Sequence, residues 1–226
     1  MLASIQLRQT EMKGRTLASR KFPRHMLNEV LNEDAEELME YIHLIEDPKY
    51  REIWGQAYGN KLGRLAQGME GRVKGTNTIF FIPKEDLPSA RWKDVTYGRI
   101  VVNYHPEKIN PNRVRLTVGG DRINYPGDCG TPTADMLTVK LLINSFTSTK
   151  GVKFMSIDIE DFCLNTPMSR YEYMRLKIAE LPQDLIDEYK LQNKETKDGY
   201  FYLEIRKGMY GLPQAGILAK KILENY

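Results

Sequence analysis

Three carboxylates lie close together in the second half of the chain, at Asp158, Glu160 and Asp161. Apolar and polar residues alternate through Lys153–Ile159, which predicts a β-strand with its apolar side chains on one face and Asp158 on the other. A carboxylate buried in such a strand needs a compensating positive charge. Mg²⁺ supplies one, because it binds one or two carboxylates and leaves its remaining positions for substrate phosphates. The alternative is that Asp158 is exposed at the end of the strand or caps the turn that follows.

A second group of residues, Ile205–Gly216, could bind an anion. Gly208 and Gly211 predict a break after a strand, and Pro213 is typical of the first turn of a helix. Gln214 would then lie at the N-terminus of that helix, where free backbone N–H groups favour negative charge. The alternative is an ordinary junction between a strand and a helix.

Three basic residues, Lys108, Arg113 and Arg115, form a third candidate group. We expect them on neighbouring strands, from which they could clamp phosphates, because guanidinium groups form paired hydrogen bonds with phosphate oxygens. The alternative is a sheet edge whose charges are solvated.

The composition excludes several classes of protein. The 226 residues carry 33 Lys and Arg against 30 Asp and Glu, and 41% are hydrophobic, which is ordinary for a globular protein with a sizeable core. Two cysteines and three histidines exclude a disulfide framework and a zinc site of the usual spacing. No apolar run approaches the roughly 20 residues of a membrane span, and Met1–Arg20 lacks the apolar segment of a secretory signal. We therefore expect a soluble, intracellular protein with no membrane partner.

The periodicity of apolar residues predicts strands interleaved with helices. Helical spacing begins at Asp34 and again at Pro48, where it continues to about Gly68. Residues 124–133 are rich in Gly and Pro and predict a loop. Strands are predicted at 78–82, 97–103, 113–118, 153–159, 172–178 and 200–206, and further helices at 134–148, 182–191 and 213–226. The pattern indicates an α+β or α/β fold.

Four segments, in this order, resemble the reverse transcriptase domain of copia-like retrotransposons. They are Val114–Gly120 (VRLTVGG), Thr131–Asn144, Ser156–Met168 (SIDIEDFCLNTPM) and Lys207–Gly216 (KGMYGLPQAG). The similarity extends from about Leu62 to the last residue. No single segment is specific, so the identification depends on all four occurring in order with suitable spacing.

The resemblance implies an α+β right-hand polymerase, with fingers and an incomplete palm behind a helical N-terminal segment. The polar, weakly patterned start of the chain predicts a loosely ordered basic arm (1–33), and helical spacing predicts a helical segment (34–75). The resemblance implies a fingers-like region (76–150) and a partial palm (151–226). It implies an RNA-directed DNA polymerase that transfers nucleotides from dNTPs to a primer 3′-OH on an RNA or DNA template, with Mg²⁺ or Mn²⁺ as cofactor. In an intact element the rest of the polyprotein, including integrase and RNase H, would be a partner, and the location would be a cytoplasmic virus-like particle.

The resemblance also assigns roles to individual residues. Asp158 matches the first metal-binding aspartate of the palm, and the neighbouring carbonyl of Ile159 can join the coordination. Arg115 matches the fingers arginine that lies against the incoming triphosphate, and Lys108 is the match to its lysine partner. The residues that match the nucleotide pocket are Asp161, Phe162, Cys163 and Gln214.

Two departures from the family pattern matter. Cys163 stands where the family usually has Tyr or Phe, whose ring excludes the ribose 2′-hydroxyl, so we expect weaker exclusion of ribonucleotides unless the position has drifted in a decaying copy. No Asp-Asp pair occurs in these 226 residues, so they lack the paired-aspartate hairpin of the family. We therefore expect the chain alone to be inactive, since removing part of a catalytic unit loses nearly all of its catalysis. The alternative function is a non-catalytic remnant of a decayed element that binds nucleic acid through its basic fingers.

Overall fold

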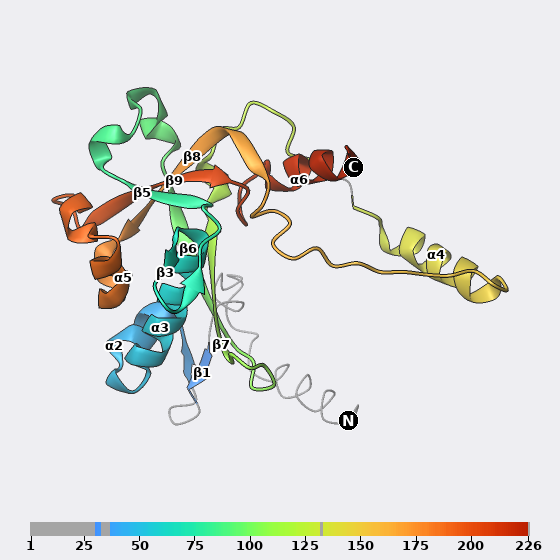
Figure 1. Cartoon of the computed structure of the whole chain (residues 1–226), viewed down its shortest axis with the longest axis horizontal. Coiled ribbons are helices and arrows are strands. Elements are labelled where there is room, and N and C mark those ends of the chain that lie inside the picture. The colour runs from blue at the N-terminus through green and yellow to red at the C-terminus, as the bar shows by residue number, and fades with distance from the viewer. Residues whose placement is uncertain (1–29, 33–36, 132, 226) are drawn as a thin grey trace, which may run out of the picture.

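The computed structural model describes residues 30–32, 37–131 and 133–225, and its central feature is a mixed five-stranded sheet (Figure 1). The strands are β5 (Ile79–Ile82), β6 (Thr96–Tyr104), β7 (Asn112–Val118), β8 (Pro167–Lys177) and β9 (Tyr200–Lys207), in the spatial order β5-β9-β8-β6-β7. Neighbouring strands are antiparallel except β6 and β8, which run parallel and pair only through Thr96 and Tyr97. Together with the helices described next, this sheet gives the chain a mixed α+β fold.

Helix α3 (Pro48–Leu65) packs against β7. It begins at Pro48 because the side chain of Asp47 accepts a hydrogen bond from the N–H of Lys49 at 2.8 Å. Trp54, Tyr58 and Leu62 recur every four residues and are buried, so this face of the helix joins the core. The helix predicted from Pro48 is confirmed.

The region before α3 differs from the prediction. A helix was expected from Asp34, but Glu37–Met39 form strand β2, which pairs antiparallel with β1 (Val30–Asn32). Helix α2 (Tyr41–Glu46) therefore begins only after this hairpin. Of the basic arm predicted at 1–33, residues 1–29 and 33 lie outside the described residues.

The core is formed where the sheet meets α2, α3 and α5 (Gln183–Glu188). Strand β9 contributes Phe201, Leu203 and Ile205 to this core, and its Tyr202 is buried in a smaller cluster with Leu87 and Tyr173, as expected for a strand covered on both faces. The strands predicted at 78–82, 97–103, 113–118, 172–178 and 200–206 all occur, shifted by a few residues at most of their ends. Two short strands, β3 (Gly68–Met69) and β4 (Val73–Lys74), form a hairpin after α3.

The two predicted helices near the C-terminal end are shorter than expected. α5 ends at Glu188 and is followed by a 3₁₀ turn at Leu191–Lys194, because Lys190 between them has a positive φ of 51°. α6 (Ala215–Glu224) follows β9 after a turn.

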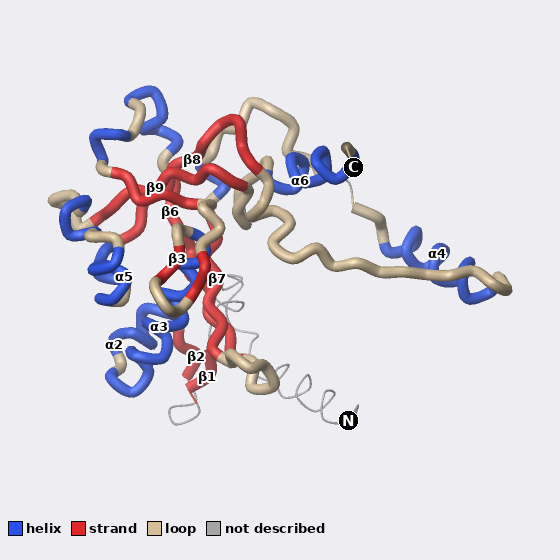
Figure 2. Tube along the Cα trace, in the orientation of Figure 1, coloured by secondary structure: helices blue, strands red, loops and turns tan. Residues whose placement is uncertain are grey.

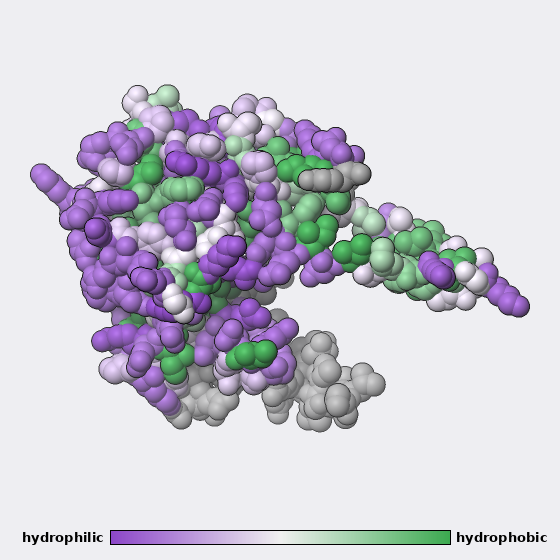
Figure 3. Space-filling view, in the orientation of Figure 1, coloured by the Kyte–Doolittle hydropathy of each residue, from purple (hydrophilic) through white to green (hydrophobic). Residues whose placement is uncertain are grey.

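Helix α4 (Met136–Ser148) lies away from the sheet, and the chain that follows it runs back toward the sheet (Figures 1 and 2). We call α4 and the returning segment, residues 136–160, the α4 arm; it is distinct from the basic arm predicted at 1–33. Asp135 caps α4 by accepting a hydrogen bond from the N–H of Thr138 at 2.7 Å. The α4 arm exposes the large apolar residues Met136, Leu137, Val139, Leu141, Leu142, Ile143, Val152, Phe154, Met155, Ile157 and Ile159, which form the apolar surface in Figure 3. Neither α4 nor any other described helix is long and apolar enough to cross a membrane.

The strand predicted at Lys153–Ile159 is not formed. A β-strand needs a neighbour to satisfy its backbone hydrogen bonds, and no strand of the described residues pairs with this segment. Met155, Ile157 and Ile159, which were expected to be buried together, are 76%, 69% and 46% exposed. The side chain of Phe154 instead stacks on that of Phe146 in α4, with ring centroids 4.3 Å apart.

Candidate functional site

The turn between β9 and α6, Lys207–Gly216, lies against the end of β7. The backbone N–H of Val118 donates a hydrogen bond to the carbonyl of Tyr210 at 2.8 Å. Gly211 has a φ of +94°, and a Cβ built on it would lie 2.1 Å from the carbonyl oxygen of Val118. Glycine alone fits there, so the two backbones are in direct contact.

The same turn contacts the chain that follows the carboxylates. The N–H of Gly208 donates to the carbonyl of Thr166 at 2.8 Å, and a Cβ on Gly208 would lie 2.5 Å from the carbonyl oxygen of Cys163. At its other end, a Cβ on Gly216 would lie 2.4 Å from Oγ1 of Thr131. Lys207–Gly216 therefore contacts all three of the other segments on which the family resemblance depends.

Arg115 projects from β7 toward this turn, with its guanidinium 5.9 Å from the ring centroid of Tyr210. This distance is within the range of a cation–π interaction. Arg113 lies on the same strand rather than on a neighbouring one. Lys108 lies in the exposed loop beyond Tyr104 and Asn112, the last paired residues of β6 and β7. The structure thus brings Arg115 to the turn and leaves Lys108 at the tip of the hairpin.

A basic cleft of about 350 Å³ lies between one face of α3, the start of β7 and the loop that precedes β7. Its cationic side chains are Lys61, Arg64, Arg72 and Arg113. Burial lowers the pKa of the Lys61 ammonium. The positive charges of Arg64, Arg115 and Arg113 lower it further, and the negative charge of Asp161 opposes them. Within the part of the chain that the structure describes, this ammonium has no hydrogen bond or ion pair. A partly desolvated cation among other cations favours the binding of an anion such as phosphate.

Arg64 connects the basic cleft to the carboxylates. Its guanidinium forms an ion pair with Asp161 and another with Glu160, at 2.9 Å from Oε1 of Glu160. Hydrogen bonds to the two carboxylates raise the pKa of Arg64. Asp161, predicted to lie at the nucleotide, is held beside the basic cleft in this way, in a backbone conformation with a φ of +53°.

Gln214 is the N-cap residue of α6, as predicted, but its side chain points into the interior. Its Nε2 donates a hydrogen bond to Oε1 of Glu172 at 3.0 Å, whereas its Oε1 has no partner among the described residues. The carboxylate of Glu172 is fully buried and forms ion pairs with Arg91 and Arg170. Burial nevertheless raises the pKa of Glu172, because desolvation outweighs the neighbouring positive charges.

The remaining predicted site residues lie on or near the α4 arm. Asp158 and Ile159 are exposed on its returning segment. No described contact links them to Arg115 or Gln214, and no group of three or more His, Cys, Asp or Glu among the described residues could hold a metal ion. Phe162 is half-buried, and its carbonyl accepts a hydrogen bond from Oγ1 of Thr166 at 3.0 Å. Cys163 is also half-buried, and burial raises the pKa of its thiol.

Sequence reasoning missed Lys61 and Arg64. They are three residues apart and therefore share one face of α3. Two cations at this spacing beside the apolar positions of a helix are a usable signal for a charged cleft, but it is weak, because such pairs are common on solvated helix faces.

Comparisons with protein-family models, with curated proteins and with solved structures found no match to this chain.

The contact of the turn with β7 predicts that Gly211→Ala is strongly destabilising. The positive φ costs about 1–2 kcal/mol for a residue with a Cβ, and the clash with Val118 adds about 1–3 kcal/mol. Gly71→Ala is the matched control, because Gly71 has a φ of +68° and nothing within 4 Å of its Cβ position. Urea unfolding should show a loss of about 3 kcal/mol or more for the first variant and about 1 kcal/mol for the second. Equal losses would contradict the backbone contact.

The buried carboxylate predicts that Arg91→Leu destabilises the protein by about 3 kcal/mol near neutral pH, because Glu172 loses its strongest partner. Removing Arg91 moves the pKa of Glu172 further above its ordinary value. The loss should therefore shrink as the pH falls through that raised pKa, where the carboxyl becomes neutral and needs no cation. Urea unfolding at several pH values measures this, with Arg99→Leu, an exposed arginine on β6, as control. A loss that is independent of pH would show that the charge of Glu172 is not the cause.

Proposed function

We propose that the chain contains the fingers and part of the palm of an RNA-directed DNA polymerase, the reverse transcriptase of a copia-like retrotransposon. The main support is that Lys207–Gly216 contacts the other three segments on which the resemblance depends. These segments are far apart in the sequence. Segments that matched one family by chance would have no reason to meet in space.

In this proposal the cations of α3 and β7 bind the triphosphate of a dNTP or the backbone of the template–primer. Lys61 and Arg115 are the main candidates, since Lys61 lacks a partner among the described residues and Arg115 faces the turn. Nucleotidyl transfer depends on positioning the reactants and on stabilising negative charge, so cations without an ion-pair partner among the described residues suit this chemistry.

Asp158 and the carbonyl of Ile159 are the proposed ligands of Mg²⁺ or Mn²⁺. The described residues supply this position with a single carboxylate and no cluster of ligands, so they do not fit a two-metal centre by themselves. We therefore derive no catalytic step through the metal. The proposed partners are template–primer, dNTPs and the rest of the polyprotein, in a cytoplasmic virus-like particle.

The second candidate is a non-catalytic remnant that binds nucleic acid through the basic cleft. It is favoured by one observation, the exposure of Asp158 on the α4 arm away from Arg115 and Gln214. The two candidates share the phosphate contacts and differ in whether a dNTP is selected by the template.

Binding to a primer–template tests the phosphate contacts that the two candidate functions share. Lys61→Gln and Arg115→Gln should each weaken binding to all sequences alike and lower the slope of log affinity against log salt by about 1. Lys197→Gln, at an exposed lysine away from the basic cleft, is the matched control and should change neither quantity. Fluorescence anisotropy at several salt concentrations provides the readout. An unchanged slope in both cleft variants would contradict the phosphate role of the basic cleft.

Adding dNTPs to a primer that ends in a dideoxynucleotide separates the two candidates. A polymerase should bind this primer–template several-fold more tightly with Mg²⁺ and the complementary dNTP than with a mismatched dNTP. A remnant should show no difference between the two nucleotides, and that result would overturn the polymerase proposal while leaving the phosphate contacts intact.

A further inference from the structure

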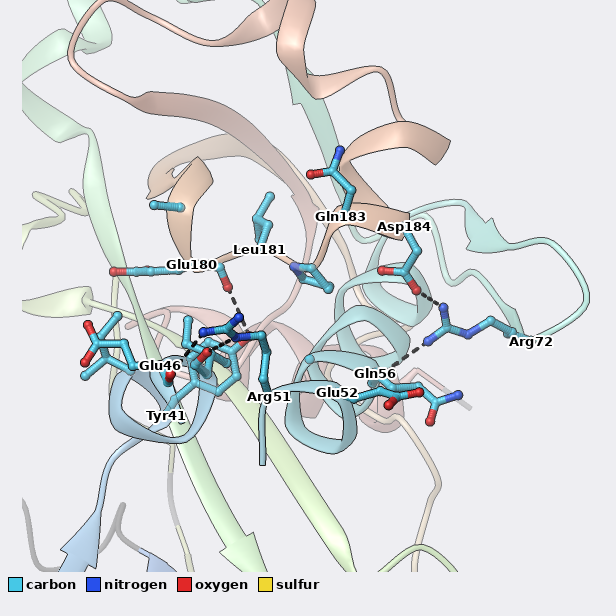
Figure 4. A pocket seen from close by; sticks show the side chains of 15 residues that line it. Tyr41, Glu46, Arg51, Glu52, Gln56, Arg72, Glu180, Leu181, Gln183 and Asp184 are labelled. Atoms are coloured by element: carbon cyan, nitrogen blue, oxygen red, sulfur yellow. Dashed lines mark hydrogen bonds and ion pairs between the residues drawn. The ribbon is translucent and has the colours of Figure 1, made fainter. Parts of the chain in front are cut away.

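A cavity of about 670 Å³ lies between α2, the first half of α3 and the segment Ala179–Asp184 that leads into α5 (Figure 4). We call it the α2–α5 cavity. Its volume is within the range of sites that bind small organic molecules, roughly 300–1,000 Å³. The proposed polymerase function does not use it.

The walls of the α2–α5 cavity are partly apolar. Tyr41 and Leu181 are buried, and Ile42, Ile45 and Pro182 lie beside them. The hydroxyl of Tyr41 donates a hydrogen bond to the backbone carbonyl of Glu180 at 3.0 Å, which fixes the ring against this wall. An apolar or aromatic group could therefore be buried here with favourable transfer from water.

The cations in the wall are already engaged. Arg51 donates from Nε to the carbonyl of Ile45 at 2.7 Å and from Nη2 to the carbonyl of Glu46 at 3.0 Å, so it caps the end of α2. Arg72 forms an ion pair with Asp184 and donates to Oδ1 of Asn60 at 2.9 Å. Figure 4 shows the guanidinium group of Arg72 at the carboxylate of Asp184 and that of Arg51 at the end of α2. Neither is free to bind an anionic ligand.

Glu180 is different, because its carboxylate makes no hydrogen bond or ion pair with any described residue. It is half-buried, and burial raises the pKa of its carboxyl; Lys177 opposes this from a distance without forming an ion pair. Behind Tyr41 lies the ring of Tyr58, 4.8 Å away, whose fully buried hydroxyl also has no partner among the described residues. The carboxylate of Glu180 therefore has no paired cation among the described residues.

We propose that the α2–α5 cavity binds an organic cation, a molecule that joins a protonated nitrogen to an apolar or aromatic body. The nitrogen donates to the carboxylate of Glu180, and the body packs on Tyr41, Leu181 and Ile45. A half-buried carboxylate gains more from such a charge-assisted hydrogen bond than an exposed one, because it has already lost part of its hydration.

Calorimetric titration of the full chain with 2-phenylethylamine tests the proposal, with 2-phenylethanol as the neutral analogue of the same shape. The amine should bind and the alcohol should bind at least about tenfold more weakly, the effect expected for a charge-assisted hydrogen bond. Glu180→Gln should weaken amine binding by about the same factor. Glu188→Gln is the matched control, because Glu188 is an exposed carboxylate on α5 outside the cavity, and it should leave binding unchanged.

A second measurement needs no variant. In amide NMR spectra the amine should shift the signals of residues 41–46 and 179–184, and the alcohol should shift them less. The proposal is overturned if the amine does not bind, if amine and alcohol bind equally, or if the shifts lie elsewhere.

Discussion

The direct contact between the backbone of Lys207–Gly216 and its neighbours is the constraint on which the arrangement of this protein depends. At Gly211 the chain touches the carbonyl of Val118, and at Gly208 it touches the carbonyl of Cys163, both closer than any side chain permits. One turn thus fixes the position of β7 and of the chain before β8. Because a steric constraint of this kind is short-ranged and rigid, it sets the register of distant segments more strictly than apolar packing does.

Two charged arrangements lie on either side of this turn. Beneath it, Gln214 reaches the buried Glu172, whose negative charge is balanced by Arg91 and Arg170. Beside it, Arg115 and the basic cleft present positive charge. Among the described residues, ion pairs with carboxylates neutralise Arg64 and Arg72 but not Lys61, Arg113 or Arg115. The hydrogen bond between Gln214 and the buried Glu172 holds the start of α6 against the sheet. In the basic cleft, by contrast, Lys61 has no partner among the described residues. The first arrangement serves the fold, and the second is available for a ligand.

The sequence predicted the helices and strands far better than the long-range contacts that they make. α3 and the five strands of the sheet were predicted because apolar periodicity reports which face of an element avoids water. The same rule failed at Lys153–Ile159, where alternation predicts a strand only if a neighbour supplies hydrogen bonds, and none of the described strands does so. Apolar periodicity also predicted α4 correctly, but it does not indicate what the apolar surface of α4 contacts. Gln214 was placed at a helix N-terminus, yet the direction of its side chain depends on Glu172, 42 residues earlier. Such long-range pairs leave no local signal.

The central claim is that a nucleotide binds where the turn Lys207–Gly216 meets β7. Photo-crosslinking with 8-azido-dATP in the presence of template–primer, followed by mass spectrometric mapping, tests it directly. The account predicts adducts in peptides that contain Lys207–Gly216, Asn112–Val118 or the Lys61 region of α3, and their suppression by excess dATP. Suppressible adducts confined to other parts of the chain, such as the walls of the α2–α5 cavity, would contradict it.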